Sequence, residues 1–268
     1  MRLFGQVVQI PIAAMDCLAP TDPTDGFRIR LVVIRRHTQR TSPRHFQQTF
    51  SKGRVIASLG AGWFEPEYRA YNLHFIEDPL ERMAYARETV HVMRELWTHP
   101  APERVTYEGT QVQVRDLPFS PAPYQKPHPP IWIGGDSDPI LGMVKEYASG
   151  WVMARSGNPE TLSRVMSAPD WPQREMTLVS SLRIFVADSH EEAVAEGTAL
   201  FEATVAAAGT TSLEAYLTRS ILGTPEECMA KIAEVESWGI NYLRFIARNS
   251  AAQERVARMI LPRLADGR

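Results

Sequence analysis

The stretch PAPYQKPHPPIWIGGDS, residues 121–137, decides the fold of this chain. Its apolar run at 130–133 enters the glycine pair Gly134 and Gly135, and a helical pattern then continues to about Tyr147. A short apolar run that ends in a glycine turn and leads into a helix is typical of a buried parallel strand followed by its helix.

The same order of strand, glycine turn and helix occurs earlier in the chain. The apolar run at 54–59 ends at the turn 60–62, and apolar residues recur at helical spacing over 79–97, with Pro79 in the first turn. Further strands are predicted at 150–154, 177–187 and 242–247, and further helices from about 158 and 190 and at 211–220, 225–238 and 250–264. Repeated strand–helix units predict a parallel sheet with right-handed crossovers.

Residues 98–129 interrupt this alternation. They contain seven prolines around two short β-like pieces at 105–107 and 112–114. The pattern predicts an ordered excursion with a small hairpin, and long loops in compact domains tend to be functional.

Composition sets the general class. The chain has 268 residues, of which 44% are hydrophobic and 22% charged, and its formal net charge is -2. We expect a single domain over residues 1–268 with no nucleic-acid partner, because no strong positive field is present. Cys17 and Cys228 have no metal-like or redox-like spacing, and no window approaches the ~18 apolar residues of a membrane span. No signal peptide is recognised, so a cytoplasmic protein without a membrane partner is expected.

Residues 53–263 resemble the luciferase-like monooxygenase family, especially its F420-dependent oxidoreductase branch. The resemblance rests on motifs in the same order as in the family: GRVIASLGAGWFEPEYRAYNLHF (53–75), ERMAYARETVHVMRELWT (81–98), VTYEG (105–109), the opening stretch, YASGWVMA (147–154), GTPEE (223–227), WGINYLRF (238–245) and the closing helix at 260–264. It implies a TIM-type (β/α)8 barrel with a flavin or deazaflavin at the C-terminal ends of the strands, and redox chemistry at the cofactor ring.

Gly134, Gly135 and Ser137 are the first candidate cofactor-binding residues. Glycines let backbone N–H groups approach an anion at a helix N-terminus, and the Ser137 hydroxyl would add a donor. In the family the corresponding stretch holds the cofactor phosphate. The competing interpretation is an ordinary glycine turn with Asp136 or Ser137 as the N-cap, and Asp136 is itself negative.

Gly60, Gly62 and Glu67 are the second candidate group, which would lie beside the cofactor ring or its side chain, with its glycine corner on the same rim of the barrel as the first. Glu67 fits equally well as a carboxylate at the start of a helix. Trp132 and Trp151 are expected to pack the barrel, and His128 is expected in a structural turn. The seven histidines form no metal-binding pattern, and no Ser/His/Asp order is evident, so no metal site is expected.

The first fifty residues depart from the family pattern. Family members begin with a strand, a helix and a second strand that ends in an acid–histidine pair. Here residues 7–12 would be that second strand, which leaves Asp16 and Cys17 as weak catalytic candidates and puts cysteine where histidine is expected. The first strand and early helices have no counterpart. Either the chain is a shortened family member, or residues 1–52 are a frame or start-site artefact. Both predict an incomplete barrel, open or seven-stranded.

Three functions follow as alternatives. The first is coenzyme F420-dependent hydride transfer to or from a small organic substrate, which the stretch at 60–71 favours. The second is an FMN-dependent monooxygenase that uses O2, and the third is a non-catalytic remnant of the family. The sequence does not identify the substrate or the oligomeric state, although a homodimer is the commonest assembly.

Overall fold

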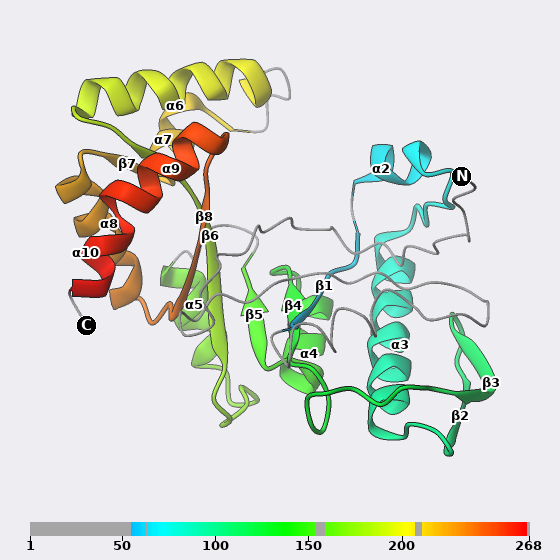
Figure 1. Cartoon of the computed structure of the whole chain (residues 1–268). Helices are drawn as coiled ribbons and strands as arrows, with labels where there is room; N and C mark the ends of the chain where they lie inside the picture. Colours follow the sequence, from blue (N-terminus) through cyan, green and yellow to red (C-terminus); the bar gives the residue numbers. More distant parts are fainter. Residues whose placement is uncertain (1–54, 63, 154–158, 207–210, 267–268) are drawn as a thin grey trace, which may run out of the picture. The chain divides into compact units, whose positions relative to one another are not determined.

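The computed structural model describes residues 55–62, 64–153, 159–206 and 211–266. Inter-residue contacts group the chain into two compact units. The first unit comprises the described residues up to Trp151 together with Pro172–Met176, and the second comprises the remainder (Figure 1). The expectation of one domain over residues 1–268 stays a prediction.

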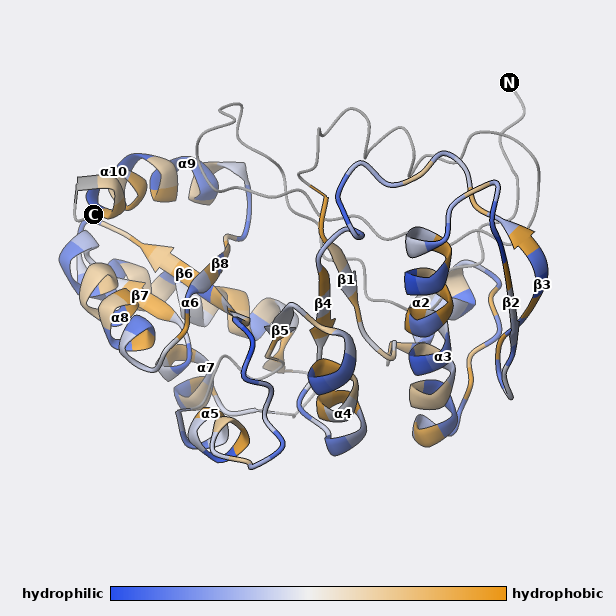
Figure 2. Ribbon diagram, turned by 90° about the horizontal axis from the view of Figure 1, so that it is seen from below, coloured by the Kyte–Doolittle hydropathy of each residue, from blue (hydrophilic) through white to orange (hydrophobic). Residues whose placement is uncertain are grey.

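The first unit is organised around buried parallel strands. Strand β1 (Ala57–Leu59) pairs in parallel with β4 (Ile131–Gly134), with Ala57 opposite Ile131 and Leu59 opposite Ile133. Strand β5 (Gly150–Val152) neighbours β4, and its first two residues belong to this unit. Ile131, Ile133 and Trp151 are fully buried, and β4 is strongly hydrophobic (Figure 2). Burial on both faces explains why β4 begins as the apolar run Ile131–Ile133.

Three helices belong to the same unit. Helix α3 (Pro79–Thr98) begins after Asp78, whose side chain accepts a 2.8 Å hydrogen bond from the Leu80 N–H. Helix α4 (Asp138–Tyr147) follows β4, as predicted. Helix α2 (Glu65–Ala70) was not predicted, because six residues are too short to show helical periodicity.

The proline-rich excursion contains the predicted hairpin. Strands β2 (Arg104–Glu108) and β3 (Gln113–Pro118) pair antiparallel. Glu88 of α3 holds their turn, because its carboxylate accepts hydrogen bonds of 2.7–3.1 Å from the N–H groups of Thr110, Gln111 and Val112. A Cβ on Gly109 would lie 2.3 Å from a Glu88 carboxylate oxygen and 2.4 Å from Cε1 of Tyr107, so glycine at 109 lets both side chains approach the turn.

The second unit is built on the long strand β6 (Thr177–Val186). Strand β8 (Tyr242–Ile246) pairs in parallel with Val179–Arg183 of β6, and β7 (Ile221–Gly223) pairs in parallel with the last three residues of β6. The helices of this unit are α5 (Pro159–Met166), α6 (His190–Thr204), α7 (Leu213–Thr218), α8 (Pro225–Ser237), α9 (Ser250–Met259) and α10 (Leu261–Asp266). Phe185 of β6 packs with Phe201 of α6 and Tyr216 of α7 in one buried cluster.

The α/β class and the parallel strand pairing are confirmed. In the described part of the chain β1 is hydrogen-bonded to β4 alone, and no barrel closes. The expected second strand at 7–12 and the candidates Asp16 and Cys17 lie outside the described residues. Among the residues that the structure describes, no helix combines the length and the apolarity that crossing a membrane requires.

Candidate functional site

The two glycine corners lie side by side on one rim. Gly60 directly follows β1, and Gly134 is the last residue of β4. Because the strands are parallel, with Leu59 opposite Ile133, both chains leave the sheet at the same edge. A Cβ placed on Gly60 would lie 3.5 Å from the Gly134 carbonyl oxygen. The sequence-based expectation that two glycine corners share a rim therefore matches the geometry.

The backbone at these corners depends on glycine. Gly62 has a φ of +61° and Gly135 a φ of +128°, a region that side-chain-bearing residues rarely adopt. A Cβ on Gly135 would also lie 3.1 Å from Cγ2 of Ile140 in α4. The rim therefore presents peptide groups where other residues would present side chains.

The N-terminus of α4 differs from the N-termini of five other described helices. Ser137 occupies the N-cap position, but its side chain makes no capping hydrogen bond, and its hydroxyl instead donates to the Met83 sulfur at 3.8 Å. Five other described N-cap residues do accept a hydrogen bond from their own helix: Asp78, Ser189, Ser212, Thr224 and Asn249. Ser137 is an N-cap by position, and its hydroxyl leaves the helix dipole uncompensated by a cap bond.

Trp151 has a contact that its sequence position did not predict. Its side chain is fully buried, as expected for a packing residue, but its indole Nε1 also donates a 2.8 Å hydrogen bond to the Gly135 carbonyl oxygen. The signal available in the sequence was a tryptophan on the strand that follows a glycine corner. A buried indole N–H needs an acceptor, and an adjacent glycine turn offers carbonyl groups.

Glu67 and His128 are two further residues that the sequence singles out in the described part of the chain. Glu67 lies in α2, but its side chain is not described. His128 precedes β4, at the opposite end of that strand from Gly134, and its Nδ1 lies 2.8 Å from the Pro129 carbonyl oxygen. His128 is also within ring contact of Trp97, with centroids 6.1 Å apart. These local contacts agree with the structural interpretation of His128.

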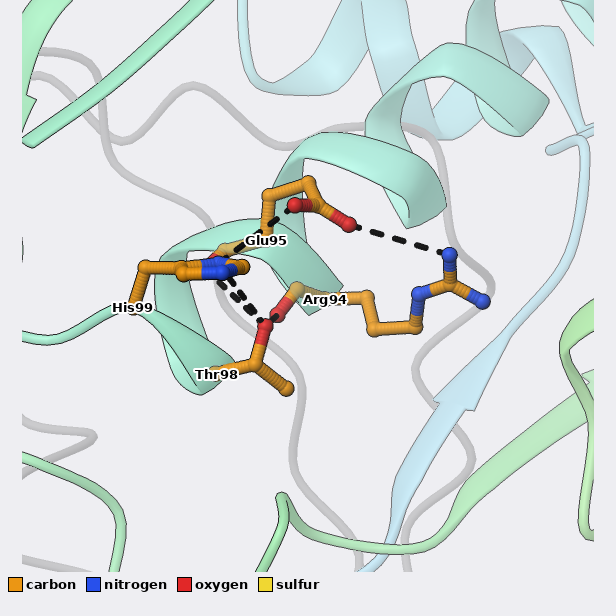
Figure 3. Close-up of polar contacts among 4 residues, drawn as sticks. All are labelled: Arg94, Glu95, Thr98 and His99. Atoms are coloured by element: carbon orange, nitrogen blue, oxygen red, sulfur yellow. Dashed lines mark hydrogen bonds and ion pairs between the residues drawn. The ribbon is translucent and has the colours of Figure 1, made fainter.

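A second polar group lies at the C-terminal end of α3 (Figure 3). Glu95 is 3.4 Å from Nδ1 of the C-cap residue His99 and 3.7 Å from Arg94. Thr98 donates a 2.9 Å hydrogen bond to the Arg94 carbonyl oxygen. The contacts that Figure 3 draws join residues of the last helical turns to one another or to their own carbonyls, so the group closes a helix end. Arg94 also lies over the ring of Tyr147 in α4, 5.1 Å from its centroid. No set of three or more histidine, cysteine or acidic side chains that could hold a metal occurs within the described ranges.

Comparison with known proteins identifies the family. Residues 47–242, most of the chain, match the luciferase-like monooxygenase family. The chain belongs to that family. The expected resemblance is confirmed over both glycine corners.

Two curated relatives differ in the cofactor that their names state. The chain is 28% identical over 111 residues to an FMNH2-dependent dimethylsulfone monooxygenase of Pseudomonas putida, an alignment that covers 41% of this chain and 29% of the relative. It is 34% identical over 108 residues to an F420-dependent glucose-6-phosphate dehydrogenase of Microbacterium testaceum (strain StLB037), covering 40% of this chain and 30% of the relative. The alignments thus span less than a third of the length of these relatives.

Solved structures support the fold. A monooxygenase from Streptomyces bottropensis superposes with a TM-score of 0.62 at 20% identity, covering 82% of this chain and 71% of that protein. An F420-dependent secondary alcohol dehydrogenase in complex with an F420-acetone adduct superposes with a TM-score of 0.63 at 17% identity, covering 80% and 71%. These likenesses and the family membership confirm the prediction of a TIM-type α/β fold.

Proposed function

We propose that this luciferase-like family member is an oxidoreductase that binds a phosphate-bearing flavin or deazaflavin at the rim where β1 and β4 end. The observation that carries the proposal is that the two glycine corners lie side by side on one rim, where a Cβ added to Gly60 would lie 3.5 Å from the Gly134 carbonyl oxygen. A side chain on Gly60 would occupy the space beside the Gly134 carbonyl oxygen, and a side chain on Gly135 would press against Ile140. The bare backbone therefore fits a flat or phosphorylated group that approaches closely.

The roles of the individual residues follow from their positions. Gly134 and Gly135 would hold the phosphate beside the N-terminus of α4, where backbone N–H groups and the helix dipole favour an anion. Ser137 would turn its exposed hydroxyl from Met83 to a phosphate oxygen. Gly60 and Gly62, with Glu67 in α2, would border the ring or its side chain. A bound flavin or deazaflavin would supply the ring that gains or loses the hydride.

Coenzyme F420 is the cofactor we favour, with hydride transfer to or from a small organic substrate. The support is the stretch GAGWFEPEYRAY at 60–71 and the higher identity, 34%, to the relative named as F420-dependent. The alternative is an FMN-dependent monooxygenase, and the 28% identity to an FMNH2-dependent relative supports it. A non-catalytic remnant is the third alternative, because Cys17 stands where the family pattern has histidine.

A cofactor titration tests this proposal. The purified full chain is titrated into F420 and, separately, into FMN, and the fluorescence of each cofactor is followed. We expect saturable quenching of F420 and little effect on FMN. Saturable binding of FMN alone would replace the F420 assignment by the alternative, and saturable binding of neither would refute the proposed function. Binding without turnover of any substrate would indicate the remnant.

We also propose that the protein forms a homodimer, which can be tested on the sample used for the cofactor titration. Sedimentation velocity of the same sample, with and without the bound cofactor, would distinguish a dimer from a monomer of 30.2 kDa.

A further inference from the structure

We infer that Trp151 is a positioning residue for the phosphate corner, acting through the Gly135 peptide. This inference rests on the proposed function. The contact is a 2.8 Å hydrogen bond from the indole Nε1 to the Gly135 carbonyl oxygen, made by a tryptophan with no exposed surface. Trp151 belongs to β5, whereas Gly135 follows β4, so a neighbouring strand orients the turn.

The bond fixes more than one atom, because a peptide group is planar. Once the Gly135 carbonyl oxygen is held, the plane of the peptide that joins Gly135 to Asp136 is also set. That peptide leads directly to Ser137, the first residue of the α4 N-terminus. The orientation of the chain segment that would face a phosphate is therefore coupled to the indole N–H.

A second contact restrains the same glycine from the helix side. Ile140 of α4 lies against Gly135, so that a Cβ there would be 3.1 Å from Ile140 Cγ2. Gly135 has a φ of +128°. Because glycine adopts positive and negative φ values about equally readily, its intrinsic preference does not fix this conformation. The hydrogen bond from Trp151 therefore restrains a turn that the glycine backbone alone would leave free to adopt other conformations.

The role is distinct from packing, since packing alone does not need the N–H group. Trp97 provides the matched control. It is equally a buried tryptophan of the first unit, with 6% of its surface exposed, but it contacts His128 at the other end of β4. Loss of buried aromatic volume is common to Trp97→Phe and Trp151→Phe, whereas loss of the bond to Gly135 occurs only in Trp151→Phe.

The test compares each cofactor with its phosphate-free form. Dissociation constants are measured for FMN against riboflavin and for F420 against its phosphate-free deazaflavin, using whichever pair the wild-type chain binds. The readout is the ratio of the two constants, which isolates the phosphate from the ring. We expect Trp151→Phe to lower this preference for the phosphorylated form about fivefold, the factor that one typical net hydrogen bond produces. We expect Trp97→Phe to leave the ratio unchanged.

The outcomes separate the inference from the function on which it rests. If the wild-type chain binds no member of either pair, the proposed function fails. If it prefers the phosphorylated form and Trp151→Phe keeps the full preference, the positioning role of Trp151 is refuted and the function stands. Should Trp151→Phe not fold, replacement of Trp151 by benzothienylalanine, which has sulfur in place of the indole N–H, retains the volume and gives the same two outcomes.

Discussion

The corner between β4 and α4 and the corner between β7 and α8 are built alike. Each strand leads into a glycine with nearly the same backbone, at a φ of +128° for Gly135 and +130° for Gly223. In each, a buried side chain donates to the glycine carbonyl oxygen, from Trp151 at 2.8 Å and from the Cys228 thiol at 3.6 Å. Burial raises the pKa of Cys228 to about 12, so the thiol keeps the proton that it donates.

The two corners differ in what satisfies the helix N-terminus. At α8 the Thr224 hydroxyl accepts from the Glu227 N–H, and the Glu227 carboxylate accepts from the Thr224 N–H at 2.8 Å, which completes a capping box. Glu227 is also 3.0 Å from His190. At α4 the side chain of Ser137 makes no such bond. The comparison teaches that two turns with nearly the same glycine backbone can differ in their N-caps: a capping box satisfies the start of α8, whereas the N-cap side chain of α4 makes no capping bond.

The largest expected effect is a loss of stability when Gly223, in the corner between β7 and α8, is replaced by alanine. An alanine at 223 would hold a strained φ of +130° and place its Cβ 2.2 Å from Oε2 and 2.9 Å from Cβ of Glu227. We expect Gly223→Ala to lower the free energy of unfolding by about 3 kcal/mol. Denaturant unfolding measures this. Gly142→Ala is the matched control, because a Cβ there meets nothing within 4 Å, and equal stability of the two variants would contradict the comparison.

A glycine-to-alanine change at Gly60, on the rim where β1 and β4 end, should act on cofactor binding. A Cβ on Gly60 makes only an ordinary contact with the Gly134 carbonyl oxygen, at 3.5 Å. Gly60→Ala should therefore fold with nearly wild-type stability, while the dissociation constant of the cofactor rises about tenfold because the added methyl group occupies the approach. Fluorescence titration of the variant measures this, again beside Gly142→Ala. An unchanged affinity would place the cofactor away from Gly60.

Hydroxyl removal sharpens the contrast between the caps. Thr224→Ala removes a capping bond and should cost about 1 kcal/mol of stability. Ser137→Ala removes no capping bond, so its unfolding free energy should stay within about 0.5 kcal/mol of wild type, while its preference for the phosphorylated cofactor falls. Thermal and denaturant unfolding of both variants give the first comparison. A larger stability loss in Ser137→Ala than in Thr224→Ala would reverse the assignment of the two corners.

The smallest expected effect is a pH dependence of the stability, which arises from Glu227 in the corner between β7 and α8. The hydrogen bond from the Thr224 backbone, helped by the nearby His190, holds the pKa of Glu227 below its ordinary value of 4.5. The stability that this bond contributes is complete above pH 4.5 and is lost as the pH falls through the lowered pKa. Unfolding midpoints of wild type and Glu227→Gln, measured from pH 6 to about pH 3, should converge as the pH falls. A constant difference between them would show that the charge of Glu227 has no role in the cap.

Much of this arrangement was predictable from local patterns. Parallel strands bring their carboxyl ends to one edge, so two glycine turns after two apolar runs predicted the shared rim of Gly60 and Gly134. The length and periodicity of 79–97 predicted α3, and the prolines of 98–129 predicted an excursion with a hairpin. Helix α2 and strand β7 escaped prediction, since six and three residues are too few to show a period.

The missing part of the site prediction concerns contacts between distant segments. The sequence around Ser137 predicts an ordinary N-cap, but the Ser137 hydroxyl donates to the sulfur of Met83, which lies 54 residues earlier in the chain. The position of Trp151 in an apolar strand predicts a packing role, but its indole N–H also donates a hydrogen bond to the Gly135 carbonyl oxygen. Such partners are fixed by tertiary packing, which a local pattern does not contain. The roles of Glu67, Asp16 and Cys17 stay predictions, because the described structure holds none of these side chains.

The way in which Glu88 holds the hairpin has an evolutionary consequence. One carboxylate on α3 receives the amides of Thr110, Gln111 and Val112, and main-chain donors of this kind are present whatever side chains the turn carries. The anchorage thus asks little of the inserted sequence beyond glycine at 109. We therefore expect the sequence of the turn to change freely while these main-chain contacts persist, with the bond from Gln111 to Glu81 and the ring contact between Tyr107 and His91 as additional side-chain contacts to the same helix.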